Sequence, residues 1–97
     1  MTSDQLYARL TELGYENLRL VDGHGWCGTF PYFTTKGLCT GLDATGLRCR
    51  WCYQDHGEAD RALANWDGKG HPPGNWIKVK GRFNGEVVDD FNPNFVK

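Results

Sequence analysis

The sequence predicts an α+β fold, a two-layer domain in which an antiparallel sheet of four to six strands carries two helices on one face. Three observations support this prediction. Apolar residues alternate with polar ones in several short runs, as they do in half-buried strands. Two other segments repeat apolar residues at helical spacing behind a capping residue. The order of these segments, with one helix at the start and one among the strands, is typical of an antiparallel sheet with packed helices.

The clearest strand signal is a hairpin formed by residues 38–42 and 47–53. The turn sequence Asp43-Ala44-Thr45-Gly46 joins the two runs, with Asp opening and Gly closing the turn. A period of two puts one set of side chains of the second run on an inner face and the other set on an outer face. The inner set is Leu47, Cys49, Trp51 and Tyr53, and the outer set is Arg48, Arg50, Cys52 and Gln54.

A helix is predicted immediately after this hairpin. Asp55 is a suitable N-cap, and Glu58 can reach back to the cap amide. Gly68 supplies a left-handed stop. Because Trp66 is the largest apolar residue of this segment, we expect it to anchor the helix on the sheet. The buried stripe at helical spacing is Ala59, Ala62, Leu63 and Trp66.

The remaining elements are predicted on both sides of this unit. A first helix begins with a Thr2–Gln5 capping box and ends at Gly14. Strands are expected over 18–21 and 26–34, where Pro31 argues for an edge position or a bulge. Towards the C-terminus, strands over 76–80 and 86–88 flank the hairpin signal Asn84-Gly85, and 89–97 reads as a loose tail.

The composition limits the kinds of protein that this chain can be. A length of 97 residues fits a single domain over 1–97. The net charge of −1 gives no global attraction to nucleic acid or anionic lipid and excludes a strongly acidic mimic of nucleic acid. Since no apolar run reaches the ~20 residues of a membrane span, we expect a soluble, intracellular protein without a membrane partner. The four cysteines are then expected to be reduced.

The cysteines allow two interpretations. Zinc is held by four Cys or His ligands, usually from two closely spaced pairs, and this chain has one such pair, in Cys49-Arg50-Trp51-Cys52. Within a strand, the two cysteines of that pair would point to opposite faces. We therefore favour cysteines that act as small core residues, with no cofactor. The alternative is a structural zinc site made by Cys27, Cys39, Cys49 and Cys52.

Basic and aromatic residues supply the candidate binding site. Five basic residues between Lys69 and Arg82 occur without an intervening acid, and Trp76 lies among them. Such a mixture of cations and aromatic rings is typical of surfaces that hold single-stranded nucleic acid. The other interpretation is an ordinary solvated strand face. The candidate binding residues are Arg48, Arg50, Trp76, Lys78 and Lys80, with Trp76 presented by the stiff loop that begins at Pro72.

The sequence does not indicate an enzyme. The single serine, Ser3, lies beside a helix cap, and the three histidines fall in turns or at a helix start. Asp43, Asp55 and Glu58 are accounted for by turn and cap roles. Gly68-Lys69-Gly70 lacks the strand and the Lys-Ser/Thr pair of a phosphate-binding loop.

A resemblance that covers about residues 35–95 is carried by four motifs: RCRWCYQD, EADRALANWDGKG, PPGNWIKVKG and NPNF. This pattern resembles short uncharacterised proteins encoded by bacteriophages and prophages. The resemblance implies an accessory protein in the cytoplasm of a bacterial host that binds a macromolecule, and it transfers no catalytic residue. Our first hypothesis is accordingly a non-enzymatic protein that binds a protein partner. The alternatives are a nucleic-acid-binding module that uses the same basic and aromatic face, and a small zinc domain.

Overall fold

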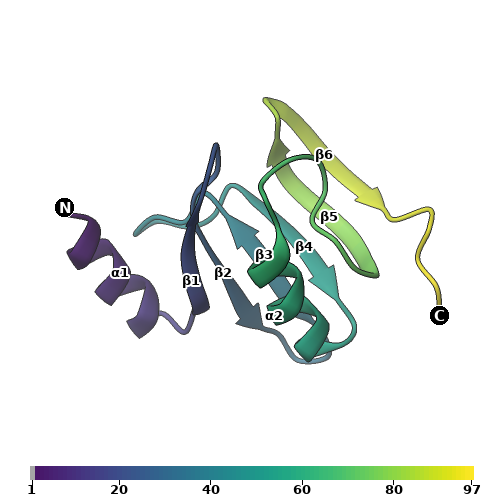
Figure 1. Cartoon of the computed structure of the whole chain (residues 1–97), viewed down its shortest axis with the longest axis horizontal. Helices are drawn as coiled ribbons and strands as arrows, with labels where there is room; N and C mark the ends of the chain where they lie inside the picture. Colours follow the sequence, from purple (N-terminus) through teal and green to yellow (C-terminus); the bar gives the residue numbers. More distant parts are fainter. Residues whose placement is uncertain (1) are drawn as a thin grey trace.

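The computed structural model describes residues 2–97 and contains an open six-stranded antiparallel sheet with two helices (Figure 1). The strands lie in the sheet in chain order, so each pairs with the next along the chain. The predicted α+β class and antiparallel sheet are confirmed. The elements are α1 (Ser3–Glu12), β1 (Glu16–Val21), β2 (Gly25–Pro31), β3 (Lys36–Thr40), β4 (Cys49–Tyr53), α2 (His56–Asn65), β5 (Trp76–Phe83) and β6 (Glu86–Phe91).

The predicted central hairpin is formed by β3 and β4. Leu38 lies opposite Trp51 in the register, and the amide of Asp43 donates to the carbonyl of Gly46 in the turn. The inner residues Cys49, Trp51 and Tyr53 are fully buried, as the alternation predicted. Leu47 is the exception, because it precedes the paired strand and packs with Leu42 on the opposite face.

Helix α2 covers one face of the sheet over β1–β4. Its N-terminus is capped by Asp55, whose carboxylate accepts hydrogen bonds from the amides of Gly57 and Glu58. Trp66 follows the helix and meets Trp51 edge-on, with ring centroids 5.6 Å apart. Only 3% of Trp66 is exposed, so its predicted anchoring role is confirmed. The buried residues of the helix are Ala59, Ala62 and Leu63.

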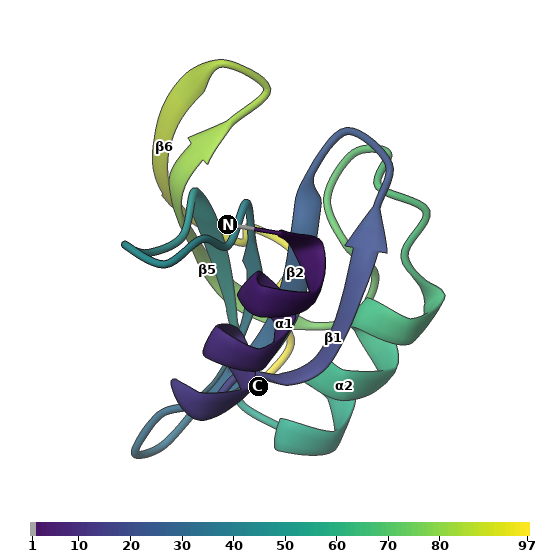
Figure 2. The ribbon, with the colours of Figure 1, turned by 90° about the vertical axis from the view of Figure 1, so that its left-hand side faces the viewer.

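Helix α1 packs on the opposite face, which corrects the expectation that both helices share one face. Leu38 belongs to the core under α2, whereas its neighbour Cys39 belongs to a second core with Leu10 of α1. Figure 2 shows the two helices on either side of β1. The physical reason is that β2 is apolar on both faces, with Cys27 in the core under α2 and Trp26 beside Cys39 in the other. We call these the α2 face and the α1 face.

Two strand boundaries also differ from expectation. Pro31 is the last residue of β2, which is an interior strand. The pairing of β2 with β1 ends at Thr29, which lies opposite Glu16, so Pro31 has no β1 residue opposite it. The missing amide of Pro31 is therefore not needed for a ladder to β1. Strand β6 continues through Phe91 into the segment expected to be a loose tail, because residues 89–91 pair with β5.

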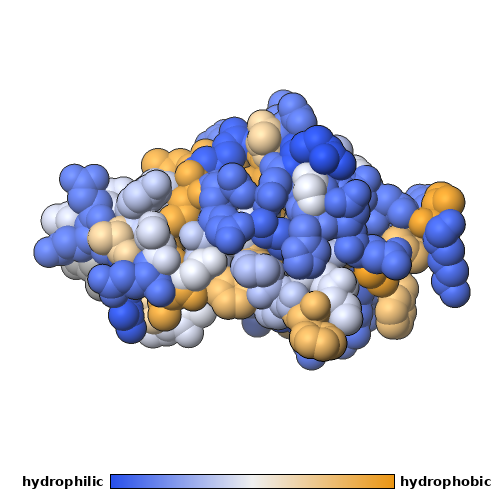
Figure 3. Space-filling model, turned by 90° about the horizontal axis from the view of Figure 1, so that it is seen from below, coloured by the Kyte–Doolittle hydropathy of each residue, from blue (hydrophilic) through white to orange (hydrophobic). Residues whose placement is uncertain are grey.

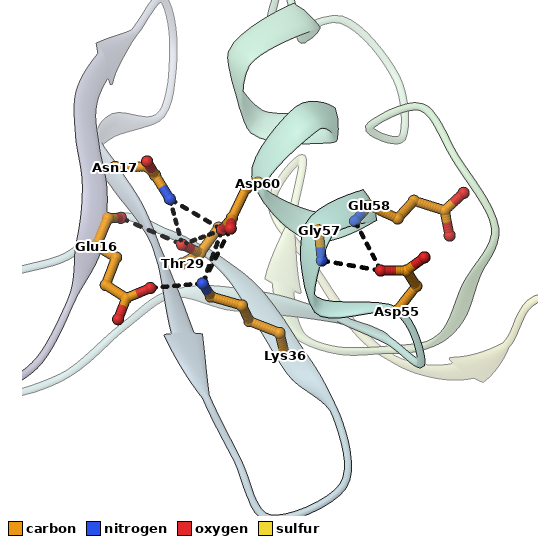
Figure 4. A network of polar contacts seen from close by, with 8 residues as sticks. All are labelled: Glu16, Asn17, Thr29, Lys36, Asp55, Gly57, Glu58 and Asp60. Atoms are coloured by element: carbon orange, nitrogen blue, oxygen red, sulfur yellow. Dashed lines mark hydrogen bonds and ion pairs between the residues drawn. The ribbon is translucent and has the colours of Figure 1, made fainter.

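A polar network joins α2 to the strands beneath it (Figure 4). Asp60 of α2 accepts hydrogen bonds of 2.9 Å from both Asn17 and Thr29. The Lys36 ammonium lies 2.9 Å from the same carboxylate and also contacts Glu16. Burial by itself would lower the pKa of Lys36, but its hydrogen bonds to Glu16 and Asp60 outweigh that effect and raise it. The network therefore keeps a charged group under the helix.

The coverage of the sheet is uneven. The core under α1 uses β1–β3 and the turn after β3, and α2 packs over β1–β4, so the β5–β6 end projects beyond both helices (Figure 1). Seen from below, the surface is largely hydrophilic with separate apolar patches, including one at the C-terminal segment (Figure 3). Neither helix within residues 2–97 has the length and apolar character needed to cross a lipid bilayer.

Candidate functional site

Basic side chains lie on the α1 face where the sheet projects beyond α1. Arg50 of β4 lies directly opposite Lys80 of β5, and Lys78 lies opposite Cys52. The strand alternation puts Arg82 on the same face as Lys78 and Lys80. Together with Arg48, which immediately precedes β4, these residues form what we call the basic surface: Arg48, Arg50, Lys78, Lys80 and Arg82.

A small pocket lies at the end of the sheet next to the basic surface, and its His24 packs against Phe83 of the α2 face. The amide of Arg82 donates to the carbonyl of Arg48 over 2.8 Å, which holds the two residues side by side. Both line a pocket of about 310 Å³ together with His24 and the β5–β6 turn at Asn84. Within the described chain, no carboxylate lines this pocket. Its chemistry suits an anion such as a phosphate group.

Arg50 is held in place by its neighbours. Its guanidinium carbon lies 5.1 Å from the centre of the Tyr32 ring, and its Nη1 donates to the Tyr32 hydroxyl over 3.3 Å. A Cβ at Gly37 would lie 2.8 Å from the Tyr32 ring and 3.2 Å from the Arg50 side chain, so glycine gives these side chains room. The hydrogen bond to Tyr32 raises the pKa of Arg50, which remains charged.

Strand β6 adds one acid and two apolar side chains beside the cations. Asp89 lies opposite Lys80, and its carboxylate is 2.9 Å from the Lys78 ammonium, which lowers the pKa of Asp89. The Lys78 ammonium also lies 5.2 Å from the centre of the Phe91 ring. Phe91 is 70% exposed, so an apolar ring borders the cations in contact with solvent. The second apolar side chain is Val87, which is 75% exposed.

Trp76 does not belong to this surface, which corrects the sequence prediction. It is 7% exposed and lies in the core on the α2 face. A register irregularity between Cys52 and Tyr53 puts Trp76 opposite Tyr53. The indole packs against His71, with ring centroids 5.0 Å apart. The loop that begins at Pro72 therefore leads to a Trp76 that is buried in the core and not presented to solvent.

The four cysteines are divided between the two faces of the sheet. Cys27 and Cys49 belong to the core on the α2 face, whereas Cys39 and Cys52 alternate onto the α1 face. This register does not bring four sulfur atoms around one point, as the zinc alternative would require. Within residues 2–97, no cluster of three or more His, Cys, Asp or Glu is placed to hold a metal ion. Burial raises the pKa of Cys39 to about 12 and that of Cys27 and of Cys49 to about 11.

Sequence reasoning placed four of the five residues of the basic surface in the candidate site. It named Arg82 in the basic run but left it out of the candidate binding residues, although the two-residue period that pairs Lys78 with Lys80 extends to Arg82. Tyr32 and Phe91 were also missed, because their positions beside Arg50 and Lys78 depend on strand pairing between distant segments.

Comparison of the chain with protein-family models, curated proteins and solved structures gave no significant match.

Proposed function

We propose that the protein binds single-stranded nucleic acid through the basic surface. The observation that carries this proposal is a set of four cations on two adjacent strands, with Arg48 just before β4 as a fifth. The rings of Tyr32 and Phe91 lie beside Arg50 and Lys78 of this set. Single strands bind to surfaces of this kind, because cations contact the phosphates while aromatic rings stack on the bases.

The separate parts of the surface have complementary roles in this proposal. The pocket between Arg48 and Arg82 holds a phosphate, and the exposed ring of Phe91 stacks on a base. Arg50 lies against Lys80, and like charges opposite each other on neighbouring strands destabilise a sheet. A bound phosphate would relieve that repulsion. A local surface is needed because the net charge of −1 offers no general attraction.

The first test is the affinity for a fluorescent oligo-dT or oligo-U strand, measured by anisotropy over a range of KCl concentrations. Three to five phosphate contacts predict that log K falls with log[salt] with a slope of roughly −2 to −3.5. Reversing two charges with Lys80→Glu and Arg82→Glu should weaken binding at least tenfold and reduce the slope.

Lys69→Glu is the matched control for the single variant Lys80→Glu, because Lys69 is exposed in the loop after α2 and its replacement reverses one charge outside the basic surface. It should leave the affinity within about twofold of the original, at equal salt. The proposed site would be refuted if Lys69→Glu and Lys80→Glu weakened oligonucleotide binding equally. It would also be refuted if the original protein showed no measurable oligonucleotide binding at low salt.

A protein partner inside a bacterial host is the second candidate, and the observation that favours it is the exposure of Val87 and Phe91 beside the cations. A poly-glutamate peptide of the same charge as the oligonucleotide separates the two candidates. Phe91→Ala should weaken oligonucleotide binding about tenfold through lost stacking. If poly-glutamate binds as tightly as the oligonucleotide, the surface recognises acidic protein segments instead.

A further inference from the structure

A cavity of opposite chemistry lies on the α2 face of the β5–β6 hairpin. It has a volume of about 570 Å³ and is lined by aromatic and aliphatic side chains, including Trp76, Phe83 and, at the β6 edge, the Phe91 ring that also borders the basic surface. Its other lining groups include His71 and the carboxylates of Glu86 and Asp90. Within the described chain, no lysine or arginine lines it. The volume falls in the range of small-molecule sites, which is about 300–1,000 Å³.

The aromatic wall of this cavity is fixed by its own contacts. The indole Nε1 of Trp51 donates to Nδ1 of His71 over 3.1 Å, which assigns the proton of the neutral imidazole to Nε2. The His71 ring stacks on Phe83, with centroids 5.2 Å apart and planes 27° apart. It also contacts Trp76 at 5.0 Å. These rings are therefore in position before any ligand arrives.

The two carboxylates, of Glu86 and Asp90, lie where they can contact a ligand that packs against the aromatic wall. Glu86 and Asp90 alternate onto the same face of β6 as Val88, which packs against the core on the α2 face. Both are exposed, and neither forms a salt bridge among the described residues. The cavity thus combines π-faces with uncompensated negative charge, and both attract an organic cation.

We propose that this cavity binds a guanidinium group carried on an apolar stem. A guanidinium is planar, so it can stack on an aromatic ring while its edge donates to carboxylates. It is also more weakly hydrated than an ammonium group, which lowers the cost of entering an apolar cavity. The apolar stem would lie against Val79 and Trp76, and the charged end would reach Glu86 and Asp90.

The test is a titration monitored by NMR shifts of the Trp76 indole and of the backbone amides of β6. N-acetylarginine amide is the probe, and N-acetylcitrulline amide is its neutral control of nearly the same shape. The arginine compound should saturate these shifts and bind at least tenfold more tightly than the citrulline compound. Butylguanidine carries the same group and the same single charge without a peptide backbone, so its affinity relative to N-acetylarginine amide distinguishes a free guanidinium compound from an arginine in a chain.

Two isosteric variants separate the carboxylates from general charge effects. Glu86→Gln combined with Asp90→Asn should weaken N-acetylarginine amide binding at least tenfold while the fold, checked by circular dichroism, is kept. Asp89→Asn is the matched control, because Asp89 lies between these residues in sequence but faces the basic surface. The proposal is overturned if the citrulline compound binds equally well, if the double variant binds normally, or if no saturable shift occurs at millimolar probe.

Discussion

At the scale of single residues, Lys36 is a buried cation that needs partners. It is 6% exposed, and its ammonium is balanced by Asp60 and Glu16. Breaking a buried ion pair costs more than replacing both partners, because the remaining charge is left desolvated and unpaired. Asp60 also accepts from Asn17 and Thr29, so it is the centre of the network.

Asp60→Ala should therefore lower the free energy of unfolding by about 2 kcal/mol, a value below the full cost for a buried pair because the Asp60 side chain is 36% exposed. Lys36→Met, which removes the cation and keeps an apolar stem, should cost less than about 1 kcal/mol, because the carboxylates that it leaves unpaired, Glu16 and Asp60, are 51% and 36% exposed and remain solvated. Urea unfolding of the two single variants and the double variant gives the coupling free energy. Strict additivity of the two changes would show that the ion pair does not organise this site.

The two tryptophans Trp66 and Trp76 show how far a residue's role follows from sequence. Trp66 continues the apolar stripe of a capped helix, and this local pattern was enough to predict its burial. Trp76 begins a strand in which strict alternation would put it on the face of Lys78, but the register irregularity beside Tyr53 turns it to the α2 face. Its burial depends on the loop that brings His71 over the indole, and no periodic signal encodes that loop.

At the scale of elements, the pairing of β4 with β5 depends on Gly81. Gly81 lies opposite Cys49 and has a φ of +135°. A Cβ there would lie 2.3 Å from the carbonyl oxygen of Arg48, a backbone atom that cannot move aside without breaking the ladder. This close approach also sets the separation between Arg48 and Arg82 in the basic surface.

We expect Gly81→Ala to destabilise the protein by about 3 kcal/mol or more, through backbone strain and overpacking together. Gly85→Ala is the matched control in the β5–β6 turn. Gly85 also has a positive φ, of +82°, but nothing lies within 4 Å of a Cβ there, so the cost should be about 1 kcal/mol. Thermal and urea unfolding would measure both changes, and similar losses would mean that the close approach at Gly81 is not what limits the sheet.

The elements themselves could be predicted where their signals are local. The hairpin around Asp43, the cap at Asp55 and the Thr2–Gln5 capping box each depend on a few neighbouring residues, and all three are present. The face on which α1 packs could not be predicted, because Trp26 and Cys27 make both faces of β2 apolar. The choice depends on packing between segments that are distant in the sequence.

At the scale of the whole molecule, the two helices leave uncovered surfaces of opposite charge on the two faces of β5. Lys78 and Lys80 alternate onto one face, whereas Val79 and Phe83 alternate onto the other and line the acidic cavity. This arrangement explains why a net charge of −1 is compatible with a basic binding surface. The net charge adds the charges of both surfaces together. The two surfaces can be told apart only from the strand alternation and from the packing of the helices.

The charged groups of the two surfaces lie on opposite faces of the sheet, but the surfaces meet at Phe91, which contacts Lys78 and also lines the cavity. We expect this shared ring to couple the two ligands only weakly. At about 0.15 M salt the screening length is about 8 Å, so charges on opposite faces interact weakly. Saturating the basic surface with oligo-dT should therefore change the affinity of the cavity for N-acetylarginine amide by less than about twofold. The measurement is the same NMR titration with and without the oligonucleotide. A tenfold loss of affinity would show that the strand crosses the exposed edge at β6 and enters the cavity, which would replace two sites by one continuous surface.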